Sequence, residues 1–378
     1  MKYNWQLLPL AAAVFFCFAQ ASAQPRERIS LDANWRFQKG DPAGMTNQLD
    51  YPSIRQWLLP TGNSFKSGNP AARPDGNLAG DVVFTQPDFD DSGWRKLNLP
   101  HDWGIEGPFN QNYPSDTGKL PWWGVAWYRK HFDISTKDAG KQIYLDVDGA
   151  MSRAIVWCNG QFVGGWPYGY ASWRVDLTPF IKTGGENVLS IRLDNPPDSS
   201  RWYPGGGIYR NVWLVKTSPV HVAHWGTHLT TPQVSQDSAT IQLAVNVENN
   251  SSAEADVKVA TKFFALDAGG KKSGRAAASV EIAGIKIAPN GNATANLSAV
   301  IPKPKLWNLE TPNRYAAVTT VEQDGKILDS YETPFGIRTI QFTATNGFLL
   351  NGKRVPINGV CDHHDLGALG SAINKRAI

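Results

Sequence analysis

Five consecutive residues near the end of the chain, residues 361–365, carry side chains that could bind a ligand or an ion. The stretch reads Cys-Asp-His-His-Asp, and its imidazole and carboxylate groups can donate hydrogen bonds to hydroxyls or accept them. Histidine and aspartate are also metal-ligand types, although adjacent histidines on a strand point to opposite faces and share an ion poorly. Hydroxyl binding, structural hydrogen bonding and metal binding are therefore open alternatives for His363, His364 and Asp365.

The residues around this cluster predict a strand before it and a helix after it. Residues 355–360 form an apolar run whose carboxyl end delivers the cluster. The stretch that follows, "GALGSAINKRAI", indicates the start of a helix with Ser371 as its N-cap. Strand, polar cluster and helix make the opening βα unit of a parallel fold, in which each strand needs neighbours on both sides. We expect residues after about 345 to pack poorly, because no such neighbour follows.

Most of the chain before that unit predicts two successive β-sandwiches. Residues 24–219 carry short apolar or alternating runs separated by Gly, Pro and Asn, without a sustained helical period, which favours a jelly roll. Residues 220–335 alternate apolar and polar side chains at period two, which favours an immunoglobulin-like sandwich. Asn-Gly at 159–160, Asp-Gly at 324–325 and Asn-Gly at 351–352 each predict a two-residue hairpin turn.

The composition is unusual in its tryptophans and balanced in its charges. Twelve of the 15 tryptophans lie between Trp35 and Trp213. Indole rings stack on the C–H faces of sugars, but large β-sandwiches also bury many aromatic rings, so both explanations are open. The 37 Lys and Arg residues and 33 Asp and Glu residues are interspersed. This balance argues against nucleic acid or another polyanion and favours a neutral ligand.

The N-terminus has the layout of an export signal. A lysine at position 2 precedes an apolar run at 7–19, and Ala-Ser-Ala at 21–23 is the small-residue pattern before a signal-peptidase cut. We expect residues 1–23 to be removed and the protein to be exported to the periplasm or the cell exterior. The apolar run is shorter than the roughly 20 residues that span a membrane, so no membrane anchor is expected.

The three cysteines predict no disulfide framework. Cys17 falls inside the apolar run, without the small residues that precede a lipidation site. Cys158 and Cys361 are about 200 residues apart, and Cys158 lies in an apolar strand-like run where a buried thiol is the usual state.

Six longer stretches resemble glycoside hydrolase family 2, and they are most similar to its β-galactosidase branch. In the family's order they are "LNLPHDWGIEGPF", "GVAWYRKHF", "VDGAMSRAIVWCNGQFVGG", "SRWYPGGGIYRNVWL", "PKLWNLETPNRY" and "GFLLNGKRVPINGVCDHHDLGALG". The resemblance implies a jelly-roll sugar-binding domain, an immunoglobulin-like domain and a catalytic (β/α)8 barrel. This order matches the division at 24–219, 220–335 and 336–378. The expected fold is therefore mainly β, with two sandwiches and only the first βα unit of a TIM barrel.

The resemblance also implies a reaction, the retaining hydrolysis of a terminal β-linked sugar. That chemistry uses two carboxyl groups about 5 Å apart. In this family both are glutamates on later strands of a barrel of about 250 residues. Residues 336–378 contain no glutamate, so we assign no catalytic residue and expect this chain, an N-terminal fragment, to be inactive alone.

The expected partner is a carbohydrate, and no cofactor or metal is implied. A β-galactoside is the first expected substrate class, and a β-glucuronide or β-mannoside is the alternative. The rival class of function is a non-catalytic carbohydrate-binding protein that works with two sandwiches alone.

Carried over by position, the resemblance implies five candidate sugar contacts. His363 matches the family's sugar-contacting histidine, and His364 and Asp365 lie beside it. The relatives have Asn-Arg-His-Glu-His where this chain has Cys-Asp-His-His-Asp. Jelly-roll loops reach over the barrel mouth in relatives, so Asp102 and Trp103 are candidates too. The alternative for Asp102 is a packed corner in which its carboxylate accepts hydrogen bonds from loop backbone N–H groups.

Two further positions bear on specificity. Some family members place a sugar-contacting carboxylate where this chain has Tyr168, which departs from a galactose-specific pattern. Arg201, in "SRWYPGGG", is expected to stack or pair structurally at a domain junction.

Overall fold

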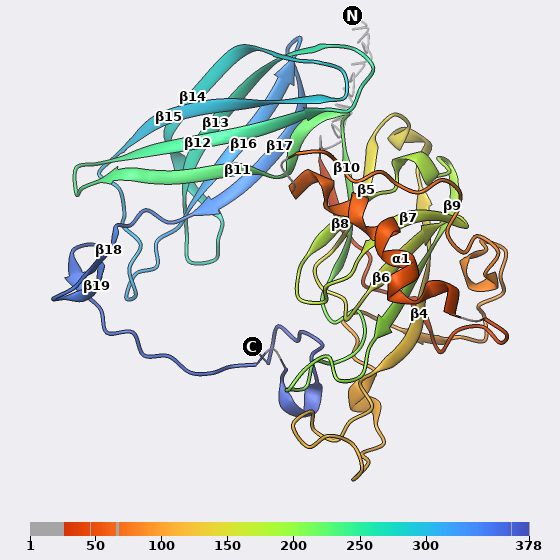
Figure 1. The fold of residues 1–378 in the computed structure, drawn as a ribbon. Coiled ribbons are helices and arrows are strands. Elements are labelled where there is room, and N and C mark those ends of the chain that lie inside the picture. Colours follow the sequence, from red (N-terminus) through yellow and green to blue (C-terminus); the bar gives the residue numbers. More distant parts are fainter. Residues whose placement is uncertain (1–25, 46, 66–67, 364, 378) are drawn as a thin grey trace, which may run out of the picture.

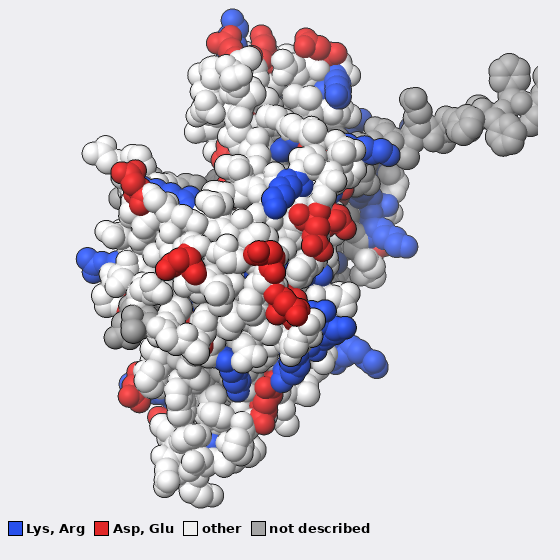
Figure 2. Space-filling view, turned by 90° about the vertical axis from the view of Figure 1, so that its right-hand side faces the viewer, with Lys and Arg blue, Asp and Glu red and all other residues white. Residues whose placement is uncertain are grey.

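The computed structural model describes residues 26–45, 47–65, 68–363 and 365–377. Two β-sandwiches follow one another along the chain, and the C-terminal segment returns to the first of them (Figure 1). Figure 2 shows basic and acidic side chains interspersed on one face, without a broad area of one sign. Within the described ranges, no helix has both the length and the apolar character needed to cross a bilayer.

The first sandwich packs a six-stranded sheet against a four-stranded sheet, and all of its strand pairs are antiparallel. The strand orders are β3-β2-β4-β9-β6-β7 and β1-β10-β5-β8. Apolar residues of both sheets, including Trp35, Trp173 and Ile191, meet in one core. The strands are β1 (Glu27–Ser30), β2 (Trp35–Lys39), β3 (Arg95–Leu97), β4 (Gly124–Ile134), β5 (Gln142–Val147), β6 (Ala154–Cys158), β7 (Gln161–Trp166), β8 (Trp173–Asp176), β9 (Gly185–Asn195) and β10 (Val212–Thr217).

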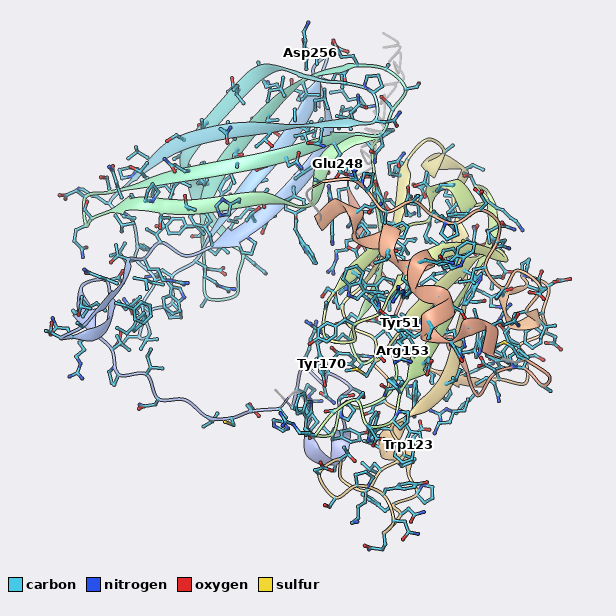
Figure 3. All side chains as sticks on the ribbon, in the orientation of Figure 1. Tyr51, Trp123, Arg153, Tyr170, Glu248 and Asp256 are labelled. Atoms are coloured by element: carbon cyan, nitrogen blue, oxygen red, sulfur yellow. The ribbon has the colours of Figure 1, made fainter. Side chains whose placement is uncertain are left out.

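One α-helix, α1 (Tyr51–Leu58), packs on this sandwich beside β7. Ile54 and Leu58 are four residues apart and therefore bury the same helix face. The guanidinium of Arg153 lies 4.9 Å above the ring of Tyr51 (Figure 3). The short 3-10 helices are η1 (Asn47–Leu49), η2 (Leu59–Phe65), η3 (Val83–Thr85), η4 (Gly104–Glu106), η5 (Thr136–Asp138), η6 (Thr178–Phe180) and η7 (Gly367–Leu369).

The second sandwich packs sheet β11-β12-β15 against sheet β14-β13-β16-β17. Burial alternates along β12, as the period-two pattern predicts for a strand with one buried face. The strands are β11 (Val220–Val234), β12 (Ser238–Asn249), β13 (Ala255–Leu266), β14 (Lys272–Ile287), β15 (Gly291–Pro302), β16 (Tyr315–Gln323) and β17 (Lys326–Phe335). A small sheet follows, formed by β18 (Ile340–Thr343), β19 (Gly347–Leu350) and β20 (Lys353–Arg354). The predicted mainly β fold with two sandwiches is confirmed.

All three predicted hairpin turns are present, between β6 and β7, β16 and β17, and β19 and β20. Both turn residues have positive φ in each case, for example 52° at Asn159 and 80° at Gly160. This is the backbone of a type I′ turn, which Asn-Gly and Asp-Gly adopt at low cost.

The predicted strand and helix near the C-terminus are not formed. Residues 355–360 lie outside every strand and are mostly exposed, and Val360 is 89% exposed. An apolar run becomes a strand only where a neighbour accepts its backbone hydrogen bonds. Among the described residues this run makes one such bond, from the Val355 N–H to the Phe348 carbonyl of β19 at 3.0 Å. Ser371 does not cap a helix but is fully buried, so the expectation of poor packing after 345 fails at this residue.

The cysteine prediction holds within the described part of the chain. Cys158 is buried in β6, Cys361 is exposed, and both are free thiols. Burial raises the pKa of the Cys158 thiol to about 12, so it stays protonated at neutral pH.

A buried ion pair joins the start of the first sandwich to the second. Arg26 Nε and Nη2 donate to Asp329 Oδ1 and Oδ2 at 3.0 and 2.8 Å. The Val222 backbone N–H also donates to Asp329 Oδ2, at 2.8 Å, and Arg26 Nη2 donates to the Val222 carbonyl at 2.6 Å. Asp329 is fully buried, so these hydrogen-bond donors, rather than water, stabilise its carboxylate.

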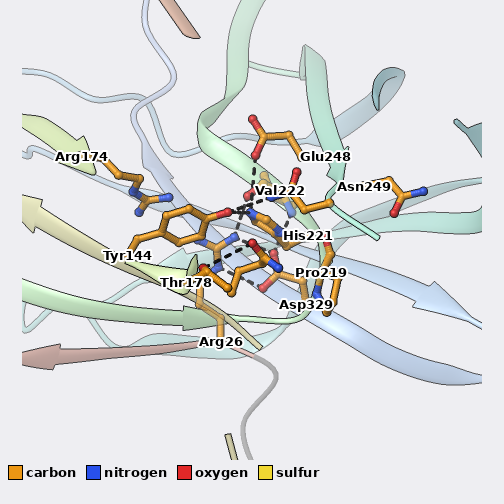
Figure 4. A network of polar contacts seen from close by, with 12 residues as sticks. Arg26, Tyr144, Arg174, Thr178, Pro219, His221, Val222, Glu248, Asn249 and Asp329 are labelled. Atoms are coloured by element: carbon orange, nitrogen blue, oxygen red, sulfur yellow. Dashed lines mark hydrogen bonds and ion pairs between the residues drawn. The ribbon is translucent and has the colours of Figure 1, made fainter. Parts of the chain in front are cut away.

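His221 lies fully buried beside this pair (Figure 4). Its Nε2 is 3.5 Å from both the Tyr144 hydroxyl and Glu248 Oε2, and its Nδ1 is 3.2 Å from the Pro219 carbonyl oxygen. Burial, followed by the positive charge of Arg26, lowers the pKa of His221 to about 4. The imidazole is therefore neutral at neutral pH.

His221 predicts a loss of stability as the pH falls from about 6.5, the pKa of an unfolded histidine, toward 4. In that pH range His221 is protonated in the unfolded chain but not in the folded chain, so the free energy of unfolding decreases as the pH falls. Asp329 and the Pro219 carbonyl oppose the shift, and Arg174 adds to it. Urea titrations at pH 7 and pH 4.5 measure how much the free energy of unfolding falls between these two pH values. We expect this fall to be about 2 kcal/mol smaller in His221→Gln than in the wild type. His228→Gln, at an exposed position of β11, should behave like the wild type; equal drops in wild type and His221→Gln would refute this account.

Candidate functional site

Two loop segments far apart in sequence form the floor of the candidate site. The backbone N–H groups of His101 and Trp103 donate to the carbonyls of Ile208 and Gly206, both at 2.8 Å. A Cβ at Gly206 would lie 2.6 Å from the Trp122 carbonyl oxygen, so only glycine fits there. The glycine run at 205–207 thus serves close backbone packing.

Asp102 is the centre of a buried hydrogen-bond network in this floor. Its Oδ1 accepts from the backbone N–H groups of Gly104 and Gly206, both at 2.9 Å. Its Oδ2 accepts from the Tyr203 hydroxyl at 2.9 Å and from Ser371 N and Oγ at 2.8 and 3.1 Å. The carboxylate is only 2% exposed. The packed corner that was the alternative for Asp102 is what the structure shows.

The partners of Asp102 are fixed in their donor states. Burial, followed by the neighbouring Asp102 carboxylate, raises the pKa of Tyr203 far above its ordinary value, so the phenol stays protonated. Trp103 is 1% exposed and belongs to the core of the first sandwich. Sugar contact by Asp102 or Trp103 stays a prediction, and for Asp102 it would require Ser371 to leave the carboxylate.

His101, next to Asp102, is also engaged. Its Nδ1 lies 2.7 Å from the Tyr128 hydroxyl and its Nε2 lies 2.9 Å from Glu106 Oε1. Burial lowers the pKa of His101, although Glu106 opposes this shift. The imidazole therefore serves as a structural link between β4 and the loop that carries Glu106.

Four side chains beside this network form what we call the aromatic patch: Tyr168, Tyr170, Trp202 and His363. Trp202 Nε1 donates to the Tyr170 hydroxyl at 2.9 Å, and the Tyr168 and Tyr170 rings lie 5.6 Å apart edge to face. The His363 ring lies 5.7 Å from the Trp202 ring, also edge to face. Tyr168 is 60% exposed. Figure 3 shows Tyr170 on the side of the first sandwich that the C-terminal segment reaches.

The aromatic patch offers the chemistry that sugar binding needs. Exposed ring faces can stack on the C–H faces of a pyranose, and imidazole and phenol groups can exchange hydrogen bonds with its hydroxyls. Of its members, the sequence singled out His363 as a contact, and Tyr168 appeared only as a departure from the family pattern. Tyr170 and Trp202 were missed as sugar contacts, because nothing in the local sequence places them near His363, which lies 193 and 161 positions further along the chain.

The other predicted residues lie apart from the aromatic patch or outside the description. Asp365 is half-buried, and its Oδ1 accepts from the Gly367 backbone N–H at 3.1 Å. His364 lies outside the described residues. Over the ranges that the structure covers, no three His, Cys, Asp or Glu side chains are grouped to hold a metal ion. Arg201, expected to pair structurally, is exposed.

Comparison with known proteins identifies the family. Residues 104–203 match the model described as glycosyl hydrolase 2 galactose-binding domain-like, and residues 220–338 match the model of glycosyl hydrolases family 2. The β-galactosidase BoGH2A of Bacteroides ovatus is 41% identical over 366 residues, which are 96% of this chain and 37% of that protein. The chain belongs to glycosyl hydrolase family 2. This family 2 chain is also 34% identical to a putative β-glucuronidase of Formosa agariphila, over 77% of its own length and 27% of that protein.

Solved structures of similar glycosidases share the fold. A glycosyl hydrolase family 2 member from Bacteroides cellulosilyticus superposes with a TM-score of 0.77 at 30% identity, over 93% of this family 2 chain and 40% of that one. A β-glycosidase from Bacteroides vulgatus gives a TM-score of 0.71 at 32% identity, over 92% and 38%. The family 2 chain thus spans 27–40% of the length of these four relatives.

Proposed function

We propose that this chain supplies sugar recognition in an exported glycosidase that acts on a terminal β-linked sugar, with a β-galactoside as the first substrate class. The observation that carries the proposal is the aromatic patch, in which His363 lies against Trp202. The similarity to a β-galactosidase and to a galactose-binding domain-like model supports the same sugar class. The export pattern at residues 1–23 supports a site of action outside the cytoplasm.

The role of these residues is binding and orientation. The Trp202 and Tyr168 rings stack on the sugar, and His363 hydrogen-bonds a hydroxyl at the edge of the stack. Retaining hydrolysis requires two carboxyl groups about 5 Å apart. Residues 336–378 contain no glutamate, and the Asp102 carboxylate is occupied by its five donors. We therefore propose that residues 1–378 alone bind the sugar without turnover.

The binding prediction is tested by titrating the chain with methyl β-D-galactopyranoside while following tryptophan fluorescence. We expect the wild type to bind the sugar saturably. Trp202→Ala should weaken the affinity roughly three- to tenfold, because the stacking face is lost, and Trp202→Phe should retain part of the affinity. Phe109→Ala removes an exposed aromatic ring on another loop of the same sandwich and should change nothing. Binding that is absent, or equal in Trp202→Ala and wild type, would overturn the assignment.

The absence of turnover is tested with chromogenic β-galactoside, β-glucuronide and β-mannoside. We expect no release of chromophore above that of the buffer. Hydrolysis that a single substitution within residues 1–378 abolishes would show that this chain carries its own catalytic group.

A uronic acid is the second candidate ligand. One relative is named as a putative β-glucuronidase, and Arg201, next to Trp202 in the chain, is exposed and could meet a sugar carboxylate. Preference for a methyl β-D-glucuronide that is lost in Arg201→Ala would favour this candidate over the galactoside.

A further inference from the structure

A cleft separates the two sandwiches at the end of the molecule away from the aromatic patch. It holds a cavity of about 480 Å³, within the range of small-molecule sites. Tyr144 and Arg174 of the first sandwich form one wall, Glu248 and Asn250 of the second form another, and Trp57 of α1 closes a side. A second cavity of about 270 Å³ shares Arg174 and His224 with the first. Figure 3 shows Glu248 at this junction and Tyr170 far from it.

The two arginines that line the larger cavity are already engaged. Arg174 Nε and Nη2 donate to the two carboxylate oxygens of Asp146 at 2.6 and 2.9 Å. The Arg73 guanidinium donates to the carbonyls of Phe162 and Val163. Little donor capacity is left for an anionic ligand, because both guanidinium groups have acceptors within the protein.

Glu248, in contrast, presents an acceptor without a strong partner. Its Oε2 lies 3.5 Å from His221 Nε2, longer than a strong hydrogen bond, and its side chain is 33% exposed (Figure 4). His221 is neutral at neutral pH, so it does not neutralise the carboxylate. Burial raises the pKa of Glu248, and the charges of Arg174 and Arg26 oppose that shift.

A second hydrogen-bonding group lies next to Glu248 in the same wall. Asn250 Nδ2 donates to the Tyr144 hydroxyl at 2.9 Å, which fixes the amide at the cavity edge. A carboxylate, an amide and a phenol side by side provide several acceptors and few free donors. This combination fits a ligand that brings its own hydroxyl donors.

Aromatic rings border both cavities. Trp57 and Phe180 line the larger cavity, and both are partly buried, which leaves part of each ring accessible. Trp225 lines the smaller one and is 54% exposed. It lies at a register shift of β11, between Val222 and Thr227, with a φ of 52°. Bulges of this kind redirect side chains and are frequent beside functional sites.

Among the described residues, a polar atom in the wall that both cavities share also lacks a hydrogen-bond partner. His224 Nε2 is buried and forms no hydrogen bond with any residue that the structure describes. Its ring stacks on Trp225 at 4.2 Å between centroids. An orphaned buried nitrogen beside a cavity calls for a water or a ligand group.

We propose that this junction cleft binds a neutral sugar unit, with Glu248 accepting hydrogen bonds from its hydroxyls and Trp57 stacking on its C–H face. Its aromatic walls, free acceptors and engaged cations match a hydroxyl-rich, uncharged ligand. This second sugar site is separate from the aromatic patch and does not depend on the activity proposed above.

The test compares variants of the chain in calorimetric titrations with methyl β-D-galactopyranoside, methyl β-D-glucopyranoside and lactose. Glu248→Gln keeps the shape of the side chain but removes the charge, and should weaken binding of at least one probe roughly five- to tenfold. Glu281→Gln, at an exposed position of β14 that lines neither cavity, is the matched control and should bind like the wild type. Methyl β-D-glucuronide should bind more weakly than the neutral probes.

Three further variants make the result decisive. Trp57→Phe should retain part of the affinity that Trp57→Ala loses, which separates stacking from a packing defect. Trp202→Ala should leave intact the part of the sugar binding that Glu248→Gln weakens. The experiment can therefore distinguish a failure of the aromatic patch from a failure of the cleft. The proposal is overturned if no neutral probe saturates, if Glu248→Gln binds every probe like the wild type, or if the glucuronide binds best.

Discussion

Replacing Asp102 with alanine is expected to lower the free energy of unfolding by about 3–5 kcal/mol. The side chain is 2% exposed and accepts five hydrogen bonds, from Gly104, Tyr203, Gly206 and two atoms of Ser371. Removing the carboxylate leaves these buried donors without an acceptor, and each such donor costs about 1–3 kcal/mol where water does not replace the lost partner. Urea unfolding followed by circular dichroism measures the loss.

Two controls identify the cause of this loss. Asp116→Ala removes an exposed carboxylate from the same long loop and should change the unfolding free energy by less than about 0.5 kcal/mol. Asp102→Asn keeps one acceptor oxygen and should fall between alanine and wild type. A stable Asp102→Ala variant would show that water replaces the carboxylate.

The same substitution should release the C-terminal segment. Ser371 N and Oγ both donate to Asp102 Oδ2, and the Ile373 backbone N–H donates to the Tyr209 carbonyl at 3.0 Å. Without Asp102, hydrogen exchange at Ser371 should accelerate and proteases should cut after residue 345 sooner than in wild type. Exchange at Ser371 that does not change would mean that packing, rather than the carboxylate, retains the segment.

Replacing Asp329 with alanine is also expected to lower the free energy of unfolding, by about 3–5 kcal/mol. Asp329 is fully buried and accepts from Arg26 Nε and Nη2 and from the Val222 backbone N–H. The substitution strands the Arg26 guanidinium, whose side chain is only 13% exposed, at the junction of the two sandwiches. A double-mutant cycle with Arg26→Ala should therefore show strong coupling, with the double variant about as stable as Asp329→Ala alone.

An exposed ion pair that also involves β17 provides the contrast. Glu332 Oε2 lies 3.1 Å from Lys272 Nζ, and both side chains are about half exposed. Glu332→Ala should lower the free energy of unfolding by no more than about 1 kcal/mol, because water solvates both charges. If Asp329→Ala and Glu332→Ala lowered the free energy of unfolding equally, burial would not explain the importance of the Arg26–Asp329 pair.

Features that depend on neighbouring residues were predictable from the sequence. The hairpin turns at 159–160, 324–325 and 351–352 follow from Asn-Gly and Asp-Gly alone, because these pairs tolerate the positive φ values that the turn requires. Alternating burial along β12 follows from period-two patterning. Two successive sandwiches could be inferred from such local signals together.

The prediction for residues 355–360 failed for the opposite reason. An apolar run gives the propensity for a strand, but a strand exists only when another strand completes its hydrogen bonds. Beyond Val355, whose N–H donates to the Phe348 carbonyl of β19 at 3.0 Å, the segment is exposed and pairs with no described strand. Ser371 illustrates the same limit, because the group that decides its role is the Asp102 carboxylate, 269 positions earlier.

By itself, the sequence determined the export pattern, the strand-rich architecture, the turns, and His363 as a candidate sugar contact. The tertiary structure decided which distant side chains meet: Asp102 with Ser371, Trp202 with His363, and Arg26 with Asp329 across the junction. The physical reason is that turn and strand preferences are properties of a few adjacent residues. The aromatic patch and the junction cleft arise instead from the packing of sheets and loops, which no local pattern specifies.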